Sequence, residues 1–426
     1  AQKGGGKYYT ADDTVGLTDA LNAIITEIMA INTTFIAPAV SVNAFNRFTH
    51  REELYYALFR PAARPNWDGN VKRFKLYGDP PEIVDSTNAL AVDANTGFFK
   101  DSAVSFWTPV ADSPDGASVQ LGGAASKLAL PRSVYTYTGA SAPSNAALSA
   151  AANALHESNV AITKTMLGDA AMTDLYRSDL LQWVRGVDLL DEDADLDTTD
   201  IRRFMGDPLH TKPVLITYGG TEASPDITLY AGTNEGYLHA INTTDGSELF
   251  AFMPAELLPN IGLLFEDNIS IAHPYGLDGP LTKWVNDVNG NGLLFTSGSL
   301  ETCEFVYLYQ GMRRGGSNYY ALDVTQRSAP ILKWMIKGGS GDFSELAQTW
   351  SAATKAKIKL NGIDKDVLIF GGGYDEAQDL NAMAKDDTTG RAIFMVDAGS
   401  GAKIWQAGPA GSANGSNPNL LLSDMT

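Results

Sequence analysis

The sequence is poor in the residues that most often carry covalent or metal chemistry. It has one cysteine, Cys303, and five histidines among 426 residues. A single cysteine excludes an intrachain disulfide and says little about the redox compartment. The histidines are scattered, without HExxH or HxH spacing, and no GxSxG motif occurs. These absences argue against a zinc or serine hydrolase.

Long apolar runs are also missing. No stretch approaches the roughly 18 uninterrupted apolar residues of a membrane span. The first residues, AQKGGGKYYTADD, lack the basic start and apolar middle of a signal peptide. The chain opens and stops within patterns, so we expect it to be a fragment of a longer protein.

Positive charge is scarce. Fifty acidic residues against 31 basic ones give a formal charge of −19. Phosphate backbones repel such a surface, so nucleic acid is not an expected partner. An acidic surface is compatible with divalent cations and an extracellular setting, and equally with simple solubility.

Alternating apolar residues and glycine-bearing turns are abundant. The segment LYAGTNEGYLHAINTTDGSELFAFMP, residues 229–254, contains three short apolar runs separated by GTNEG and NTTDG turns. Such spacing predicts an antiparallel meander, and Asp-Gly is a strong hairpin signal. Three short strands in a row fit one blade of a β-propeller.

This pattern recurs at residues 319–336 and 392–407. Each copy has an apolar strand ending in Asn or Asp, a polar turn, and a strand ending in Phe or Trp. The anchors Asn242, Asp323 and Asp397 lie 81 and 74 residues apart. A propeller blade takes roughly 40 to 50 residues, so each step holds two blades or one blade with a long insertion. We expect a mainly β fold in which residues 206–426 form four or five blades of an incomplete, modified, quinoprotein-like β-propeller.

The N-terminal half predicts a helical and β extension. Residues 12–31 place apolar residues on one helical face, within a helical linker at 1–39. Residues 40–205 form a mixed extension with long loops, in which Leu54–Arg60 and Val71–Tyr77 are strands and a hairpin-like pair surrounds Asp93–Gly97. Residues 111–150 are mostly loop. Residues 146–186 are expected to return to helix, in AALSAAANALHESN and then MTDLYRSDLLQWVRGVDLL.

Two segments have the residue types of calcium loops. The run DEDADLDTTD alternates four carboxylates, those of Asp191, Asp193, Asp195 and Asp197. Calcium takes six to eight oxygen ligands, and alternating carboxylates on an irregular loop can converge on one ion.

The second segment, DVNGNG, places Asp287, Asn289 and Asn291 at positions 1, 3 and 5 of an EF-hand-type loop, with Gly292 at position 6. Position 12 is Gly298 instead of Glu, so Glu301 or Glu304 would have to supply further oxygens. An ordinary Asn-Gly hairpin turn accounts for the same residues.

Several long stretches resemble the C-terminal region of the type IV pilus tip proteins of the PilY family. They are FRPAARPNWDGNVKRFKL (59–76), MGDPLHTKPVLITYG (205–219), AGTNEGYLHAINTTDGSELFAFMPAELLPNI (231–261), GMRRGGSNYYALDVT (311–325) and VLIFGGGYDE (367–376). They occur in the family order across nearly the whole chain. Some relatives have DxDxDG runs before the MGD motif, and Leu196 stands here where those runs have Gly.

The resemblance implies a secreted, non-enzymatic adhesin and assembly factor at the pilus tip of a Gram-negative bacterium. It would promote pilus extension, oppose retraction and mediate attachment, with calcium as a modulating cofactor. The implied partners are minor pilins and a host or abiotic surface.

Two alternatives stay open at this point. One is a quinoprotein-type dehydrogenase, because MVDAGSGAKIW (395–405) loosely fits the A-x-D-x-x-T-G-x-x-x-W repeat of those enzymes. Their quinone pocket typically has a vicinal cysteine pair, which one cysteine cannot supply. The other alternative is a carbohydrate- or matrix-binding propeller module, in which exposed aromatic residues would matter.

Overall fold

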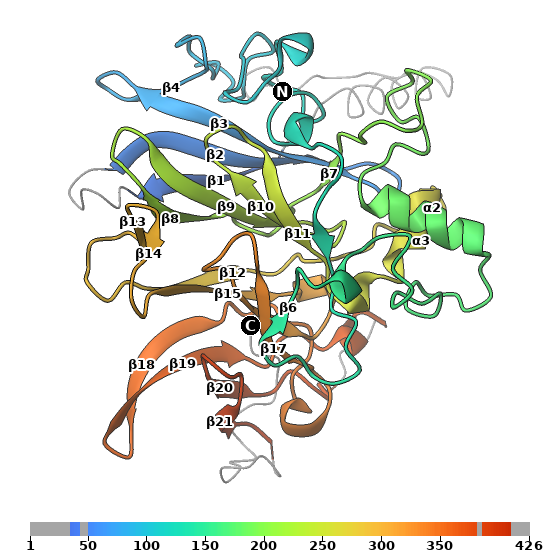
Figure 1. Ribbon diagram of the computed structural model, residues 1–426, viewed down its shortest axis with the longest axis vertical. Coiled ribbons are helices and arrows are strands. Elements are labelled where there is room, and N and C mark those ends of the chain that lie inside the picture. The colour runs from blue at the N-terminus through green and yellow to red at the C-terminus, as the bar shows by residue number, and fades with distance from the viewer. Residues whose placement is uncertain (1–34, 43–49, 381–385, 410–426) are drawn as a thin grey trace, which may run out of the picture.

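The computed structural model describes residues 35–42, 50–380 and 386–409. The helix predicted over residues 12–31 lies outside these ranges. Within them the chain is mainly β, as predicted, with a few short helices at the sides of the sheets (Figure 1).

The first sheet is built from the N-terminal extension. Its strands follow one another in the order β1-β2-β3-β4, and β7 also pairs with β3. Both strands predicted here are confirmed, since β2 contains Leu54–Arg60 and β3 contains Val71–Tyr77. The bounds are β1 (Phe35–Val42), β2 (His50–Arg60), β3 (Asp68–Tyr77), β4 (Glu82–Val84) and β7 (Met205–Gly206).

Three further sheets contain the repeated segments. Each has four consecutive antiparallel strands, apart from the small insertion of β13 and β14, and two gain a fifth strand from the loop-rich region. The first is β8 (Val214–Gly220), β9 (Pro225–Gly232), β10 (Leu238–Asn242) and β11 (Glu248–Phe252), with β5 (Val134–Tyr135). The second is β12 (Leu281–Asn286), β15 (Phe305–Gly311), β16 (Tyr319–Asp323) and β17 (Ile331–Ile336), with β6 (Ala146–Ala147). The third is β18 (Thr354–Leu360), β19 (Ile363–Gly371), β20 (Ile393–Asp397) and β21 (Lys403–Ala407).

These sheets are arranged like successive propeller blades. The first strands adjoin one another, because β8 contacts β1 and β12, and β12 contacts β18. In Figure 1 the sheets follow in chain order from the blue β1–β4 sheet to the red β20–β21 hairpin. Separate buried clusters of apolar side chains lie between neighbouring sheets. The β1–β4 sheet therefore occupies the place of a blade before β8–β11.

One carbonyl group in each repeat links a blade to the sheet before it. It belongs to the residue after the Asn or Asp that ends the strand. Trp107 Nε1 donates to the carbonyl of Thr243 at 3.3 Å, and Tyr218 Oη donates to that of Val324 at 2.8 Å. Trp334 Nε1 donates to the carbonyl of Ala398 at 3.2 Å. The repeated hairpin is therefore also the element that couples adjacent sheets.

The number of blades differs from the prediction. Three four-stranded sheets follow residue 206 in the described part of the chain, where four or five blades were expected. Each step of the repeat is one blade with long connections. One connection holds α3 (Asn260–Glu266), and another holds the two-stranded pair β13 (Phe295–Thr296) and β14 (Ser299–Leu300).

One predicted helix is present and another is wrong. The helix α2 (Asp174–Val184) begins after Thr173, whose hydroxyl accepts the N–H of Tyr176 at 3.1 Å. The alanine-rich segment 146–159 forms the short strand β6, a three-residue 3-10 helix at Ala151–Asn153, and turns. Its Leu148 N–H donates to the carbonyl of Pro330, so tertiary pairing replaces the intrahelical bonds that alanine favours.

Two shorter predictions for the N-terminal extension, one of a turn and one of a loop region, are confirmed. Gly97 donates its N–H to the carbonyl of Asp93, and a bridge between Val92 and Phe99 closes this turn. Residues 111–150 are mostly loop, as expected, and contribute β5 and β6 as outer strands.

Candidate functional site

The acidic loop after α2 brings three of its four predicted carboxylates together. One oxygen each from Asp191, Asp193 and Asp195 lies within 4.8 Å of the other two. Asp197 is not part of this group, and its carboxylate instead accepts the hydroxyl of Thr199 at 2.6 Å. The alternation of acidic residues therefore predicted all three members of this cluster and one residue, Asp197, that does not belong to it.

Repulsion within this loop is visible in its neighbours. Burial raises the pKa of Asp188, and the nearby Glu192 and Asp193 raise it further. Burial also raises the pKa of Asp200, together with the charges of Asp195 and Asp193. A bound divalent cation would relieve this repulsion.

The DVNGNG loop has the same internal hydrogen bonds as the acidic loop. The carboxylate of Asp287 accepts the N–H of Gly292, five residues on, at 2.8 Å, as Asp191 accepts that of Leu196 at 3.0 Å. Asn289 Oδ1 accepts the N–H of Asn291 at 2.9 Å, as Asp193 accepts that of Asp195 at 3.4 Å.

Position 6 of both loops is left-handed. Its φ is +79° at Gly292 and +72° at Leu196. Leu196 thus adopts the backbone conformation for which glycine is usual, so its side chain does not prevent the loop from forming. The side chain of Leu196 points outward and is 89% exposed.

Glu304 is the acidic residue that joins the second loop. Its Oε1 accepts the N–H of Val288 at 3.1 Å and that of Asn289 at 3.3 Å. The residue is only 4% exposed, and its Oε2 has no hydrogen-bond partner among the described residues. A buried carboxylate oxygen without a donor is costly, and a small cation would satisfy it. The oxygens present in both loops therefore fit calcium.

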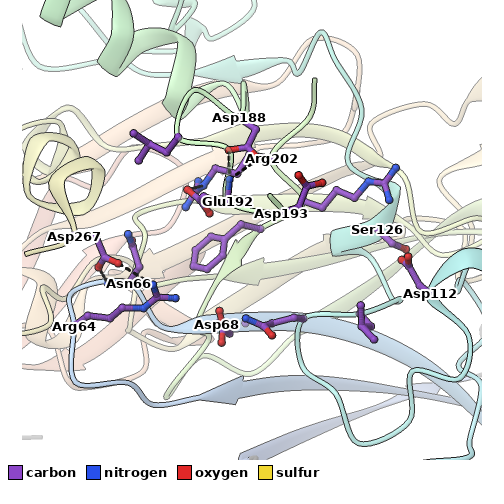
Figure 2. Close-up of a pocket in the computed structure, with 16 residues that line it drawn as sticks. Arg64, Asn66, Asp68, Asp112, Ser126, Asp188, Glu192, Asp193, Arg202 and Asp267 are labelled. Atoms are coloured by element: carbon purple, nitrogen blue, oxygen red, sulfur yellow. Dashed lines mark hydrogen bonds and ion pairs between the residues drawn. The ribbon is translucent and has the colours of Figure 1, made fainter. Parts of the chain in front are cut away.

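A cavity of about 560 Å³ adjoins the acidic loop (Figure 2). Its wall combines that loop with residues near Asn66, Asp112 and Asp267. Arg202 closes the wall, because it donates to Glu192 at 2.8 Å and to Glu235 at 2.7 Å. Its guanidinium also lies 3.9 Å from the ring centroid of Trp183, so the acidic loop is tied to α2 and to the first blade.

Sequence reasoning missed this cavity. Its wall comes from four segments that are distant along the chain, and no spacing rule joins them. The arginine pair at 202 and 203, directly after the acidic run, was the one local signal.

The MGD motif forms a buried cluster that sequence reasoning also missed. Asp207 Oδ1 lies 3.3 Å from His273 Nε2, and Asp207 Oδ2 accepts Asn234 Nδ2 at 2.6 Å. His210 Nδ1 lies 2.8 Å from Asp278 Oδ2. Burial raises the pKa of Asp207 to about 7, and the nearby Asp278 adds to the rise. Two histidines that look scattered in the sequence therefore meet two buried aspartates here.

His239 packs inside the first blade. It is 1% exposed, and its Nδ1 lies 2.7 Å from Glu248 Oε1. Arg132 donates to the same carboxylate at 2.8 Å and, with His239, lowers the pKa of Glu248 to about 2 against the effect of burial. This network fastens the loop-rich extension to the blade.

Two smaller features of the sequence can be compared with the structure. The GGGYDE segment is a junction of strand and turn, since β19 ends at Gly371. Within the described residues, no helix combines the length and apolar character needed to cross a bilayer.

Comparison with known proteins identifies relatives by sequence. No protein-family model matches the chain. The type IV pilus biogenesis factor PilY1 of Pseudomonas aeruginosa is 28% identical over 222 residues, which are 51% of this chain and 17% of that protein. The PilY1 homologue of Xylella fastidiosa is 32% identical over 134 residues, 32% of this chain and 10% of that protein.

Among solved structures, the crystal structure of the P. aeruginosa PilY1 C-terminal domain covers 45% of this chain and 32% of that one, with 23% identity and a TM-score of 0.29. The chain spans less than a fifth of the length of the curated relatives it matches. Over about half of its own length, the chain is similar in sequence to the PilY1 type IV pilus biogenesis factors.

Proposed function

We propose that this chain is the β-rich part of a type IV pilus biogenesis protein and that it acts without catalysis. The supporting observation is its sequence similarity, over 222 residues, to proteins named as pilus biogenesis factors. The rigid blades would serve as a scaffold, and the loops around them would make the protein contacts.

The same proposal extends to the location of the protein and to its role at the pilus. The protein would be secreted to the cell surface of a Gram-negative bacterium and would sit at the pilus tip with minor pilins. There it would promote extension, oppose retraction and attach the pilus to a host or abiotic surface.

A non-enzymatic role is favoured over a quinoprotein dehydrogenase. The single cysteine, Cys303, is exposed, so no vicinal cysteine pair can line a quinone pocket. Dye reduction with added quinone and alcohols should therefore remain at background, and turnover would contradict the proposal.

Deletion of the gene, followed by counting surface pili and measuring twitching, tests the pilus role. We expect fewer pili and less twitching, restored by the full-length gene. Unchanged piliation and motility in the deletion strain would reject the role.

We also propose calcium as the cofactor of the two loops, each of which would be stiffened by the ion. Calorimetric titration of the chain should give heat with calcium, reduced by Asp193→Ala in the first loop and by Glu304→Gln in the second. Asp245→Ala is the matched control, because Asp245 is exposed and its carboxylate accepts the N–H of Ser247 in an ordinary hairpin turn. No heat at roughly millimolar calcium, a range reached by weak extracellular sites, would reject both loops.

A further inference from the structure

Six arginines in the described part of the chain lie over aromatic rings, and four of them share one arrangement. In those four, the ring covers the face of the guanidinium while a carboxylate accepts from its edge at 3.0 Å or less. They are Arg73, Arg132, Arg202 and Arg327. This is the expected use of a planar cation, which stacks through its face and donates through its edge.

The remaining two, Arg313 and Arg314, lack that close carboxylate. Arg313 lies 4.4 Å from the ring centroid of Trp350 and forms no ion pair with any described residue. Its Nε is buried and has no hydrogen-bond partner in the part of the chain that the structure describes. Arg314 lies 5.3 Å from the same ring, and its nearest carboxylate oxygen, on Asp379, is 3.9 Å away. Although the chain has a formal charge of −19, the described residues thus leave two adjacent guanidinium edges open.

The backbone that carries these arginines is held in place. Arg313 has a φ of +51°, a left-handed conformation that is unfavourable for a residue with a side chain. Thr349 Oγ1 accepts the N–H of Met312 at 2.7 Å and that of Arg313 at 3.2 Å. Because strain persists only where the surroundings enforce it, the two cations are positioned before any ligand arrives.

The charges of the pair are not balanced locally. Burial lowers the pKa of Arg313 and the adjacent Arg314 adds to this effect, while the buried Asp278 opposes it. Asp278 is already paired with His210. An anion between the two arginines would remove their repulsion.

We propose that Arg313 and Arg314, on the connection between β15 and β16, form a binding site for an organic carboxylate, as carried by an acidic side chain or the C-terminus of a protein. Two guanidinium edges match the two oxygens of a carboxylate. The half-buried rings of Tyr275 and Trp350 give the body of the ligand an apolar flank. An extended polyanion is disfavoured, because the rest of the surface repels it. The site is independent of the calcium loops and of the pilus role.

Calorimetry on the full chain at low salt tests the site with inorganic phosphate and with three organic probes. N-acetylphenylalanine has a terminal carboxylate, N-acetylaspartic acid α-amide has a side-chain carboxylate, and N-acetylphenylalanine amide has neither. We expect at least one carboxylate to bind and the amide not to bind, and the stronger of the first two identifies the source. Each charge-assisted hydrogen bond is worth roughly a tenfold change in affinity or more, so Arg314→Gln and the double variant with Arg313→Gln should weaken binding by at least that factor.

Arg203→Gln is the matched control, since it removes one exposed positive charge elsewhere and should leave affinity unchanged. Arg314→Gln lies at an exposed position, so it remains informative if changes at the strained Arg313 lower stability. Absence of binding by both carboxylates, equal binding of the amide, tighter binding of inorganic phosphate, or full affinity in the double variant would each overturn the proposal.

Discussion

At the scale of single residues, Asp207 carries the clearest consequence for stability. It is 1% exposed, and burial together with Asp278 raises its pKa to about 7. His273 Nδ1 lies 2.6 Å from the carbonyl of Pro65, which can only accept, so this nitrogen carries a hydrogen. Its Nε2 therefore faces Asp207 as an acceptor when the ring is neutral, and burial lowers the pKa of His273 in favour of that form. A protonated Asp207 fits both neighbours.

Asp207→Asn should therefore stabilise the protein in a pH-dependent way. Between about pH 4 and pH 7 the folded wild type retains a proton that the unfolded chain has lost, so its stability falls as the pH rises through this window. The asparagine variant lacks this loss, and its Nδ2 can donate to His273. We expect the difference in the free energy of unfolding to widen from pH 4 to pH 7 and then to stay constant.

Urea unfolding at several pH values measures this difference. The widening should persist at high salt, because it arises mainly from burial and salt screens surface charges. A constant difference across the whole range would show that Asp207 is ionised in the folded protein.

At the scale of elements, the turn of the repeated hairpin contains a glycine whose substitution should destabilise the protein. Gly401 has a φ of +72°, and a Cβ built on it would lie 2.8 Å from the ring of Trp334 in the preceding blade. Gly246 meets Trp107 in the same way, at 2.7 Å. In these two of the three repeats, the glycine of the turn makes room for the tryptophan whose Nε1–H bonds to the carbonyl nearby.

Gly401→Ala should cost about 2–4 kcal/mol in the free energy of unfolding, from the left-handed backbone and the clash together. Gly399→Ala is the matched control two residues earlier, where the nearest atom to a new Cβ is a carboxylate oxygen at 3.5 Å. It should change stability by less than about 1 kcal/mol. Urea unfolding measures the free energy of unfolding of both variants. Similar decreases in the two would show that the contact with Trp334 is not what makes Gly401 important for stability.

Local sequence patterns predicted those elements whose structure is determined by residues close together in the chain. Strands and hairpin turns follow from alternation and turn residues, so β2, β3 and the three repeats were found. Segment 146–159 failed because its helix propensity gives way to pairing of β6 with β17. The MGD cluster and Glu304 depend on contacts made after folding. Composition alone could not select Glu304 over Glu301.

At the scale of the whole molecule, the β1–β4 sheet behaves as part of the ring of blades. Trp107 Nε1 and Arg73 Nη1 both donate to the carbonyl of Thr243. The equivalent carbonyl in each of the other two repeats accepts a hydrogen bond from the preceding blade. Side chains of both sheets, including Tyr55 from β2 and Leu229 from β9, share one buried cluster around Trp107. The interface is therefore a continuous core rather than a contact between separate domains.

Trp107→Ala should test this continuity. Removing a fully buried tryptophan costs about 3–5 kcal/mol, and the loss should reach both sides of the interface. Hydrogen exchange should speed up in β3 and in β9 and β10 together, and urea unfolding should keep a single transition with a lower midpoint. Trp405→Ala, at a side chain that is 37% exposed on β21, is the control and should leave exchange in these strands unchanged. Faster exchange confined to the β1–β4 sheet would mean that the extension folds as a separate unit, and the ring of blades would then begin at β8.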